Sequence, residues 1–315
     1  MRRTLSFILV TLTFCFTLLA EDVRVGILNG PSCVPVVQMM EKKSNTSYTQ
    51  FADPQALLPK MLKKEIDVGF LPANVAAKVY NSSSKALVML AITGNGNIKL
   101  ITSDAAVKDF SDLSGKTLYV AGQGATPDYL TRYLLDQNQV SAELSFSVPT
   151  PQIAAQLISK KIEYAVVPEP FSTIALLKSK DVKAAIDYQV EYSLLNGADA
   201  KIPLTVLVAS RDFAEKNTKA LNDFLKNYEK SYNWVVKHAV QAGNLCEKHN
   251  LGLAADVVAK AIPVSNYVYI PAKDAQKNVE DFLQILLEYS ADSIGGKLPE
   301  ADFYYNPAAY EAKSE

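Results

Sequence analysis

One phrase of the sequence occurs twice, over residues 54–72 and 151–168. Each copy opens with Pro-Gln, carries apolar residues at helical spacing up to a pair of lysines, and ends in an acidic residue, an apolar run and a proline. The residues expected on the buried helix faces are Leu58, Met61 and Leu62 in the first copy and Ala154, Leu157 and Ile158 in the second. The apolar run predicts a strand buried on both faces, as in parallel sheets. Each copy therefore predicts a helix that leads into a parallel strand.

The segments before the two copies also match. Residues 23–28 and 117–120 have strand character, and each is followed by a turn that contains Gly and Pro. The same order of strands and helices in both halves predicts an α/β fold of two lobes, each with a mainly parallel sheet. Ligands of such sheets bind at the carboxyl ends of the strands. We therefore expect a ligand cleft between two facing lobes.

The order of these elements also predicts where the chain passes between the lobes. A Gly- and Asn-rich interruption within 93–103 and an apolar strand within 200–210 are expected to be the two crossings of a hinge. This assigns 21–100 and 203–315 to lobe 1 and 101–202 to lobe 2. Beyond the second crossing, apolar residues recur at helical intervals almost to the end, and this helical tail is expected to pack on lobe 1.

Residues 1–20 differ from the rest of the chain. A positive start, an apolar run over 5–19 and acidic residues directly after Ala20 predict an export signal that is cleaved near Ala20. A membrane anchor would need about 20 apolar residues and a positive flank on the retained side. A lipoprotein cut before Cys15 is an alternative, but Phe14 stands where a small residue is expected. We expect the mature protein in the periplasm or otherwise outside the cytoplasmic membrane.

The charge balance and the few cysteines and histidines limit the functional classes that the sequence allows. With 32 Lys and Arg against 33 Asp and Glu, no field of one sign predicts nucleic acid as a partner. After the signal only Cys33 and Cys246 remain, enough for one bridge or none. The histidines are His238 and His249, and their spacing from Cys246 is compatible with a metal site but more typical of a plain helix surface. Without a nucleophile elbow or phosphate loop, we expect no catalytic residue, metal or cofactor.

Binding is better supported than catalysis. The loops 29–33, 72–74, 122–126 and 168–171 each lead into a predicted helix, whose free N–H groups favour a ligand oxygen, and 93–97 lies beside the hinge. The candidate ligand-binding residues are Asn29, Ser32, Cys33, Asn74, Thr93, Asn95, Gln123, Ala125, Thr126 and Glu169. The alternative is that the Ser, Asn and Thr residues only cap helices. Glu169, between two prolines, would either accept a hydrogen bond from a ligand N–H or brace the hinge.

The character of the ligand is left partly open. Arg24, Arg132 and Arg211 are the only arginines after the signal, and none lies in the candidate loops. A site for a sulfonate or another small oxyanion often uses a guanidinium group, although helix N-termini alone can hold an anion. The pattern favours a nitrogen heterocycle, on which Phe171 or Tyr129 could stack unless these rings belong to the core.

Taken with the repeated phrase, the Leu-Ser-Gly-Lys lead-in at 113–116 and the Val-Pro-Glu-Pro-Phe corner at 167–171 complete a resemblance. The mature chain is similar to the periplasmic substrate-binding proteins of ABC importers, in the nitrate, sulfonate, taurine and thiamine-precursor family. The resemblance implies a type II periplasmic-binding fold that closes on a small molecule and delivers it to an ABC transporter permease in the inner membrane. It also implies a monomer that is not an enzyme.

Two other classes remain open from the sequence. Relatives of this fold include enzymes that act on menaquinone or thiamine-pyrimidine intermediates. The thiamine-pyrimidine type carries a cysteine-rich motif and a histidine that this chain lacks. A cell-surface adhesin is the third class, and it would bind no small molecule.

Overall fold

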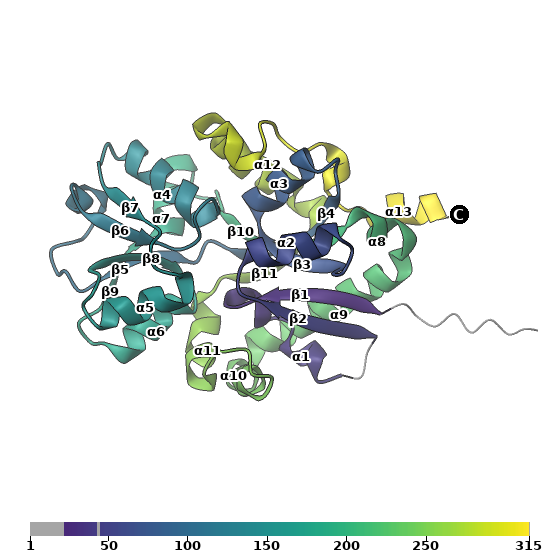
Figure 1. The fold of residues 1–315 in the computed structure, drawn as a ribbon, viewed down its shortest axis with the longest axis horizontal. Coiled ribbons are helices and arrows are strands. Elements are labelled where there is room, and N and C mark those ends of the chain that lie inside the picture. The colour runs from purple at the N-terminus through teal and green to yellow at the C-terminus, as the bar shows by residue number, and fades with distance from the viewer. Residues whose placement is uncertain (1–21, 43–44, 315) are drawn as a thin grey trace, which may run out of the picture.

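The computed structural model describes residues 22–42 and 45–314, and within them two β-sheets lie side by side, each flanked by helices (Figure 1). The expected export signal, with Cys15 and the cleavage position at Ala20, lies outside the described residues. Sheet A has the order β11-β4-β10-β3-β1-β2, and sheet B has the order β7-β6-β8-β5-β9. We call sheet A with the helices packed on it lobe 1, and sheet B with its helices lobe 2. The strands of sheet A are β1 (Val23–Leu28), β2 (Thr46–Phe51), β3 (Val68–Pro72), β4 (Leu87–Asn95), β10 (Pro203–Ser210) and β11 (Tyr267–Pro271), and those of sheet B are β5 (Ile98–Thr102), β6 (Thr117–Val120), β7 (Glu143–Ser145), β8 (Tyr164–Pro168) and β9 (Lys183–Asp187).

The five strands of sheet B have the same topology as β2, β1, β3, β10 and β4 of sheet A, and the edge strand β11, antiparallel to β4, has no counterpart in sheet B. In sheet A, β1 pairs in parallel with β2 and β3, and in sheet B, β6 pairs in parallel with β7 and β8. One strand runs against these in the middle of each sheet, β10 in sheet A and β5 in sheet B, and β4 and β9 lie beyond it. Because β4 and β9 return to the main direction, most strands of each sheet are parallel. The predicted α/β fold of two mainly parallel lobes is confirmed.

Helices cover both sheets and follow the strands in chain order. The α-helices are α1 (Val37–Met40), α2 (Pro54–Leu62), α3 (Ala73–Ser82), α4 (Thr126–Gln137), α5 (Thr150–Ile158), α6 (Phe171–Lys178), α7 (Tyr188–Asn196), α8 (Arg211–Lys216), α9 (Thr218–Lys237), α10 (Ala239–Lys248), α11 (Ala255–Ala261), α12 (Ala272–Tyr289) and α13 (Pro307–Ser314). Short 3-10 turns are η1 (Pro31–Cys33), η2 (Phe110–Leu113), η3 (Ile262–Val264), η4 (Ala291–Ile294) and η5 (Ala301–Phe303). Within the described residues, none of the helices has the length and apolar character needed to cross a membrane.

The repeated phrase forms α2 and β3 in lobe 1 and α5 and β8 in lobe 2. Both helices end with a lysine in the left-handed region, Lys64 and Lys160, each at φ 59°. The register differs from the prediction, because α5 begins at Thr150, so Thr150 and not Pro151 is the counterpart of Pro54. In α2 the buried residues are Leu57 and Met61, and the prediction that Leu62 is buried is wrong, since 46% of it is exposed.

The chain passes from sheet A to sheet B between β4 and β5, and returns between α7 and β10. The return segment precedes the apolar strand that was expected to make the crossing, since β10 pairs with β3 and β4 along its length. The added Cβ of any other residue at Gly96, in the first crossing, would lie 2.7 Å from Gln189 Oε1. Gln189 in turn accepts the N–H of Ile202 at 3.0 Å, so the two crossings pack against each other.

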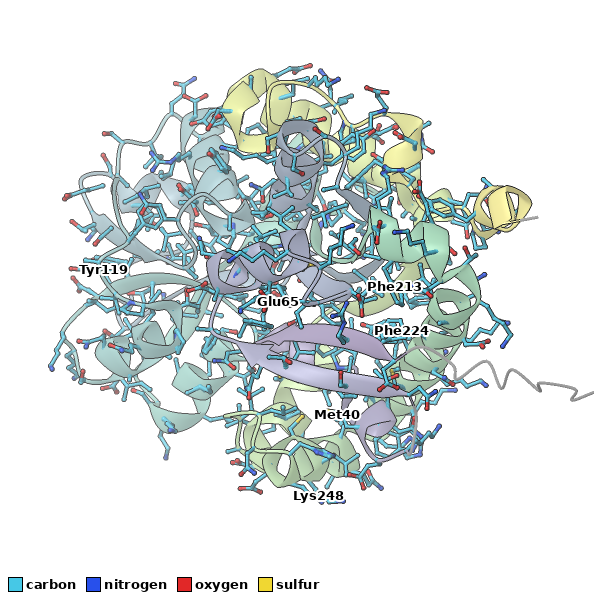
Figure 2. The ribbon with its side chains drawn as sticks, turned by 45° about the vertical axis from the view of Figure 1, so that its right-hand side comes forward. Met40, Glu65, Tyr119, Phe213, Phe224 and Lys248 are labelled. Atoms are coloured by element: carbon cyan, nitrogen blue, oxygen red, sulfur yellow. The ribbon has the colours of Figure 1, made fainter. Side chains whose placement is uncertain are left out.

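The tail is less helical than expected. β11 was not predicted and pairs with β4 at the edge of sheet A. The long helical run divides into α8, α9 and α10 at Asn217 and His238. α10 lies against α1, with Lys248 below Met40 in Figure 2, and the Lys248 ammonium pairs with Glu41 at 2.6 Å. The tail packs mainly on lobe 1, while α12 also reaches lobe 2 through a Phe282–Tyr192 ring contact.

Candidate functional site

A cavity of about 180 Å³ lies between the two lobes. Its lining comes from the segment after β1, the start of α2 and α3, the loop before α4, and the first residues of α5 and α6. The lining residues are Leu28, Asn29, Ala52, Asp53, Pro54, Gln55, Leu58, Val75, Gly122, Gln123, Gly124, Ala125, Thr150, Pro151 and Phe171. A second cavity of about 300 Å³ adjoins it, shares Asn29, Ala52, Pro151 and Phe171, and extends to the loop 250–253 between α10 and α11. Together they form one cleft at the carboxyl ends of the parallel strands, where the fold predicts it.

The two repeats contribute equivalent positions to this cavity. In the register of β3 and β8, Pro54 corresponds to Thr150, Gln55 to Pro151 and Val75 to Phe171, and all six residues line the cavity. Pro54 and Thr150 are the first residues of their helices. The cavity is thus bounded by matching helix N-termini from opposite lobes, whose first N–H groups lack partners within the helix.

The lining is neutral in character. Among the described residues around the two cavities there is no Lys, Arg or His, and Asp53 is the charged side chain. The Asp53 carboxylate accepts the N–H of Ala56 at 2.8 Å and so caps α2. Phe171 presents an aromatic ring to both cavities, and an added Cβ at Gly30 of lobe 1 would lie 3.5 Å from that ring. The site can enclose a small molecule between amide, backbone and apolar groups, without a fixed cation.

Three of the predicted ligand-binding residues line the cavity: Asn29, Gln123 and Ala125. Asn29 is exposed, and its Oδ1 accepts a hydrogen bond from Gln50 Nε2 at 2.6 Å. Ala125 precedes α4, and its N–H donates to Gly122 O at 3.0 Å. Their positions are compatible with the predicted role, which stays a prediction.

Ser32 and Cys33 lie behind the cavity wall. Ser32 Oγ both accepts from Leu28 N–H and donates to Leu28 O, at 3.2 Å in each case, and so closes the turn after β1. Cys33 is buried, and its thiol donates to Gly30 O at 3.0 Å. Burial raises the pKa of the Cys33 thiol to about 12, so it stays protonated at neutral pH and is no nucleophile. Cys33 and Cys246 are both free, and the single bridge that their number allowed is not formed.

Asn74 and Thr126 are brought together across the lobes. Thr126 Oγ1 donates to Asn74 Oδ1 at 3.1 Å, and both side chains are buried. Neither lines the cavity, because each is turned to the other lobe. Their polar groups are therefore used within the protein.

Thr93 and Asn95 belong to β4 near the first crossing. Thr93 Oγ1 donates to Thr205 O at 3.2 Å, which ties β4 to β10. Asn95 Oδ1 is buried and has no hydrogen-bond partner among the described residues, so it stays open to a donor. Neither residue lines the two cavities, and their predicted ligand contacts are not tested.

Glu169 follows β8 and is 1% exposed. Its carboxylate accepts from the Ser172 hydroxyl and from the Thr173 N–H, the latter at 3.1 Å. A carboxylate at a helix N-terminus stabilises the helix through these N–H groups and the helix dipole. These bonds lie within the start of α6, so they show a helix cap, and the two roles considered from the sequence, a ligand contact and a hinge brace, stay predictions.

The sequence of residues 20–247 matches the NMT1-like family. The chain belongs to this family. No curated protein matches the sequence. Among solved structures, an ABC transporter protein from Parabacteroides distasonis is similar with a TM-score of 0.75 and 24% identity, covering 91% of this chain and 99% of that one. The periplasmic aliphatic sulphonate binding protein SsuA from Escherichia coli is similar with a TM-score of 0.67 and 19% identity, covering 89% and 92%.

The resemblance to periplasmic binding proteins is thereby confirmed at the level of the fold. The same fold also carries an enzyme, the desulfurization enzyme DszB, which is similar with a TM-score of 0.63 and 13% identity, covering 93% of this chain and 99% of that one. Fold alone does not decide between capture and catalysis.

Several lining residues of this NMT1-like chain were not among the predicted ligand contacts. Asp53, Gln55, Thr150 and Pro151 stand at the starts of the two repeated helices, so the position of each helix start after a predicted strand is the signal that would have found them. The loop 250–253 enters from the tail and carries no comparable signal.

The residues considered for metal binding lie apart from the cleft. His238 Nδ1 lies 2.8 Å from Trp234 O, and Nε2 of His249, the residue after α10, lies 2.7 Å from Glu41 Oε1 after α1. In the part of the chain that the structure describes, no group of His, Cys, Asp and Glu is arranged to hold a metal ion.

Proposed function

We propose that this chain is an exported solute-binding protein that captures a small, uncharged nitrogen-containing molecule between its lobes and delivers it to an ABC transporter permease. The observation that carries the proposal is the cavity between the lobes, which is lined by matching positions of both repeats and, among the described residues, by no cationic side chain. A neutral ligand with N–H and ring groups suits amide acceptors and the Phe171 ring, whereas a sulfonate would leave its charge to helix N-termini alone.

Transport rather than catalysis is supported by the state of the reactive groups. Cys33 is buried as a neutral thiol, and no histidine is among the described lining residues. Closure of the two lobes about the paired crossings would bury the ligand and present a closed surface to the permease. We expect a monomer, because each lobe supplies half of the cavity within one chain.

A thermal-shift screen of the mature protein tests the proposal. The library contains neutral heterocycles, thiamine precursors, flavin-like molecules, sulfonates and nitrate. A bound metabolite raises the melting midpoint by mass action and is recovered unchanged after denaturation. A converted product would support the enzymatic alternative instead, a preferred sulfonate or nitrate would overturn the neutral ligand class, and the absence of any shift would favour an adhesin.

A further inference from the structure

The first turn of α3 lies where the lobes meet, and it carries both Val75, which lines the cavity, and Asn74, which does not. Asn74 is 0% exposed, and its side-chain amide makes three hydrogen bonds. Nδ2 donates to Gly124 O at 3.2 Å and to Ser293 O at 3.3 Å, while Oδ1 accepts from Thr126 Oγ1 at 3.1 Å. Gly124 and Thr126 belong to lobe 2, whereas Ser293 belongs to the tail packed on lobe 1. Both N–H donors and the acceptor of this one amide are therefore in use, and one donor and the acceptor bind across the lobe boundary.

The lobe 1 side of this contact is fixed by the tail. Asn74, Lys78 and Asn81 lie on one face of α3, since they are spaced by about one helical turn. Lys78 pairs with Asp292 at 2.8 Å, and Asn81 Nδ2 donates to the carbonyls of Ile294 and Lys297 at 2.7 Å each. The segment 292–297 thus holds this face of α3, and Asn74 is the member of the face that also reaches lobe 2 (α3 and α12 lie together in Figure 1).

The lobe 2 side of the contact is part of the cavity wall. Gly124 lines the cavity and adopts φ +74°, and its N–H donates to Asp128 Oδ2 at 2.9 Å. Its carbonyl is the group that Asn74 holds. Gly124 in the cavity wall is therefore held through its N–H by Asp128 of its own helix and through its carbonyl by a side chain of the opposite lobe.

We infer that Asn74 is a positioning residue that links lobe closure to the shape of the cavity wall. When the lobes separate, the Thr126 hydroxyl and the Gly124 carbonyl lose this partner together, and when the lobes meet they regain it together. Because a buried amide is costly to leave unpaired, the contact favours either full closure or full opening. Every partner in this contact is a group of the protein itself, so the contact can form before a ligand binds, and we expect a closed population in the ligand-free protein. That closure encloses a ligand rests on the proposed function, whereas the closure of the two lobes does not depend on it.

The test measures the distance between spin labels in the ligand-free protein. Labels are placed at Ala56 on α2 and Gln152 on α5, both exposed and on opposite lobes, while Cys33 and Cys246 are buried. The parent protein, in which the Asn74 contact is intact, is expected to show a population with a short distance between the two labels. Asn74→Ala should remove this population and shift the distribution to longer distances. Thr126→Val, which preserves shape and removes only the hydroxyl, should shift it in the same direction by less.

Asn81→Ala is the matched control. It removes two hydrogen bonds between the same helix and the same tail segment but touches nothing in lobe 2. It is expected to lower the melting temperature and to leave the distance distribution unchanged. Identical distributions for Asn74→Ala, Thr126→Val and the parent protein would overturn the inference, as would an equal shift in Asn81→Ala. No ligand is used, so a failed metabolite screen would contradict the proposed function and leave this result standing.

Discussion

The two lobes share one helix and strand unit but hold it by different contacts. In lobe 1 the acidic residue before β3, Asp67, is buried and pairs with Arg24 of β1 through an Nη2–Oδ1 distance of 2.6 Å. In lobe 2 the corresponding Glu163 is exposed, and the strand register places the uncharged Thr117 where lobe 1 has Arg24. The same pattern of sequence gives a half-buried ion pair in one lobe and a solvated side chain in the other. The difference is set by the residue on the neighbouring strand, which is Arg24 in lobe 1 and Thr117 in lobe 2.

The packing of the repeated helices differs in the same way. α2 lies on Gly26 and Gly69, where an added Cβ would come within 2.3 Å of Leu57 and 2.9 Å of Met61, respectively. The strand register places Tyr119 and Ala165 at the matching positions beneath α5. Tyr119 packs on the apolar cluster of lobe 2, and Figure 2 shows it in that lobe, away from α2. Lobe 1 therefore achieves close approach of helix to sheet by omitting side chains, and lobe 2 fills the same space with them.

The ion pair gives the largest expected difference between the lobes. Asp67→Ala removes the carboxylate that accepts from the Arg24 guanidinium and, at 2.9 Å, from the Arg24 N–H. We expect a loss of about 2 to 3 kcal/mol in the free energy of unfolding, less than for a fully buried pair because Arg24 is 45% exposed. Glu163→Ala, its counterpart, should change stability by no more than about 0.5 kcal/mol. Urea denaturation measures both, and equal losses would show that the lobes do not differ here.

The close approach of α2 to Gly26 gives the next largest expected effect on stability. Gly26→Ala forces Leu57 or α2 to move, and such overpacking costs about 1 to 3 kcal/mol. Gly94→Ala is the control in the same sheet, since its added Cβ would lie 3.7 Å from Thr205, an ordinary contact. Denaturation midpoints compare the two variants. A stable Gly26→Ala protein would mean that α2 has room to shift and that the close approach is not required.

The residues that follow β3 and β8 differ in helix capping, and this difference has a smaller expected effect on the free energy of unfolding. β3 is followed directly by Ala73, which offers no side-chain cap, whereas β8 is followed by Glu169, which caps α6. Glu169→Gln should lower the free energy of unfolding by about 0.5 to 2 kcal/mol and leave ligand affinity unchanged. Melting temperature and dissociation constant are measured on the same variant. An affinity loss of about 1 to 3 kcal/mol without a change in melting would return Glu169 to the ligand site.

The sequence was informative where structure depends on local pattern. The repeated apolar spacing was enough to predict two lobes and the location of the cleft, because burial along a helix or strand follows its period. It missed β11, since Tyr267–Pro271 is short and its strand character depends on pairing with β4. It misplaced Leu62 because it took residues 58, 61 and 62 as the buried face of the first helix, whereas the structure buries Leu57 and Met61.

The candidate site shows the same limit. Asn29, Gln123 and Ala125 line the cavity as expected, because their place at strand ends follows from topology. Asn74 occupies an expected loop, but the direction of its amide depends on Ser293 and Gly124, which are distant in sequence. Residue type and local position predict that a polar group lies near the cleft. Its bonding partners are set by the tertiary fold.

The central claim, that equivalent positions of both lobes enclose the ligand, is tested most directly by the dissociation constant of the metabolite identified in the screen. Val75 and Phe171 are the equivalent lining residues, and Leu176 is an exposed residue on the same helix as Phe171. The account predicts that Phe171→Ala weakens binding by about tenfold or more, about 1.4 kcal/mol, that Val75→Ala weakens it by less, and that Leu176→Ala leaves it unchanged. Unchanged affinity in both Phe171→Ala and Val75→Ala, in folded proteins, would contradict it.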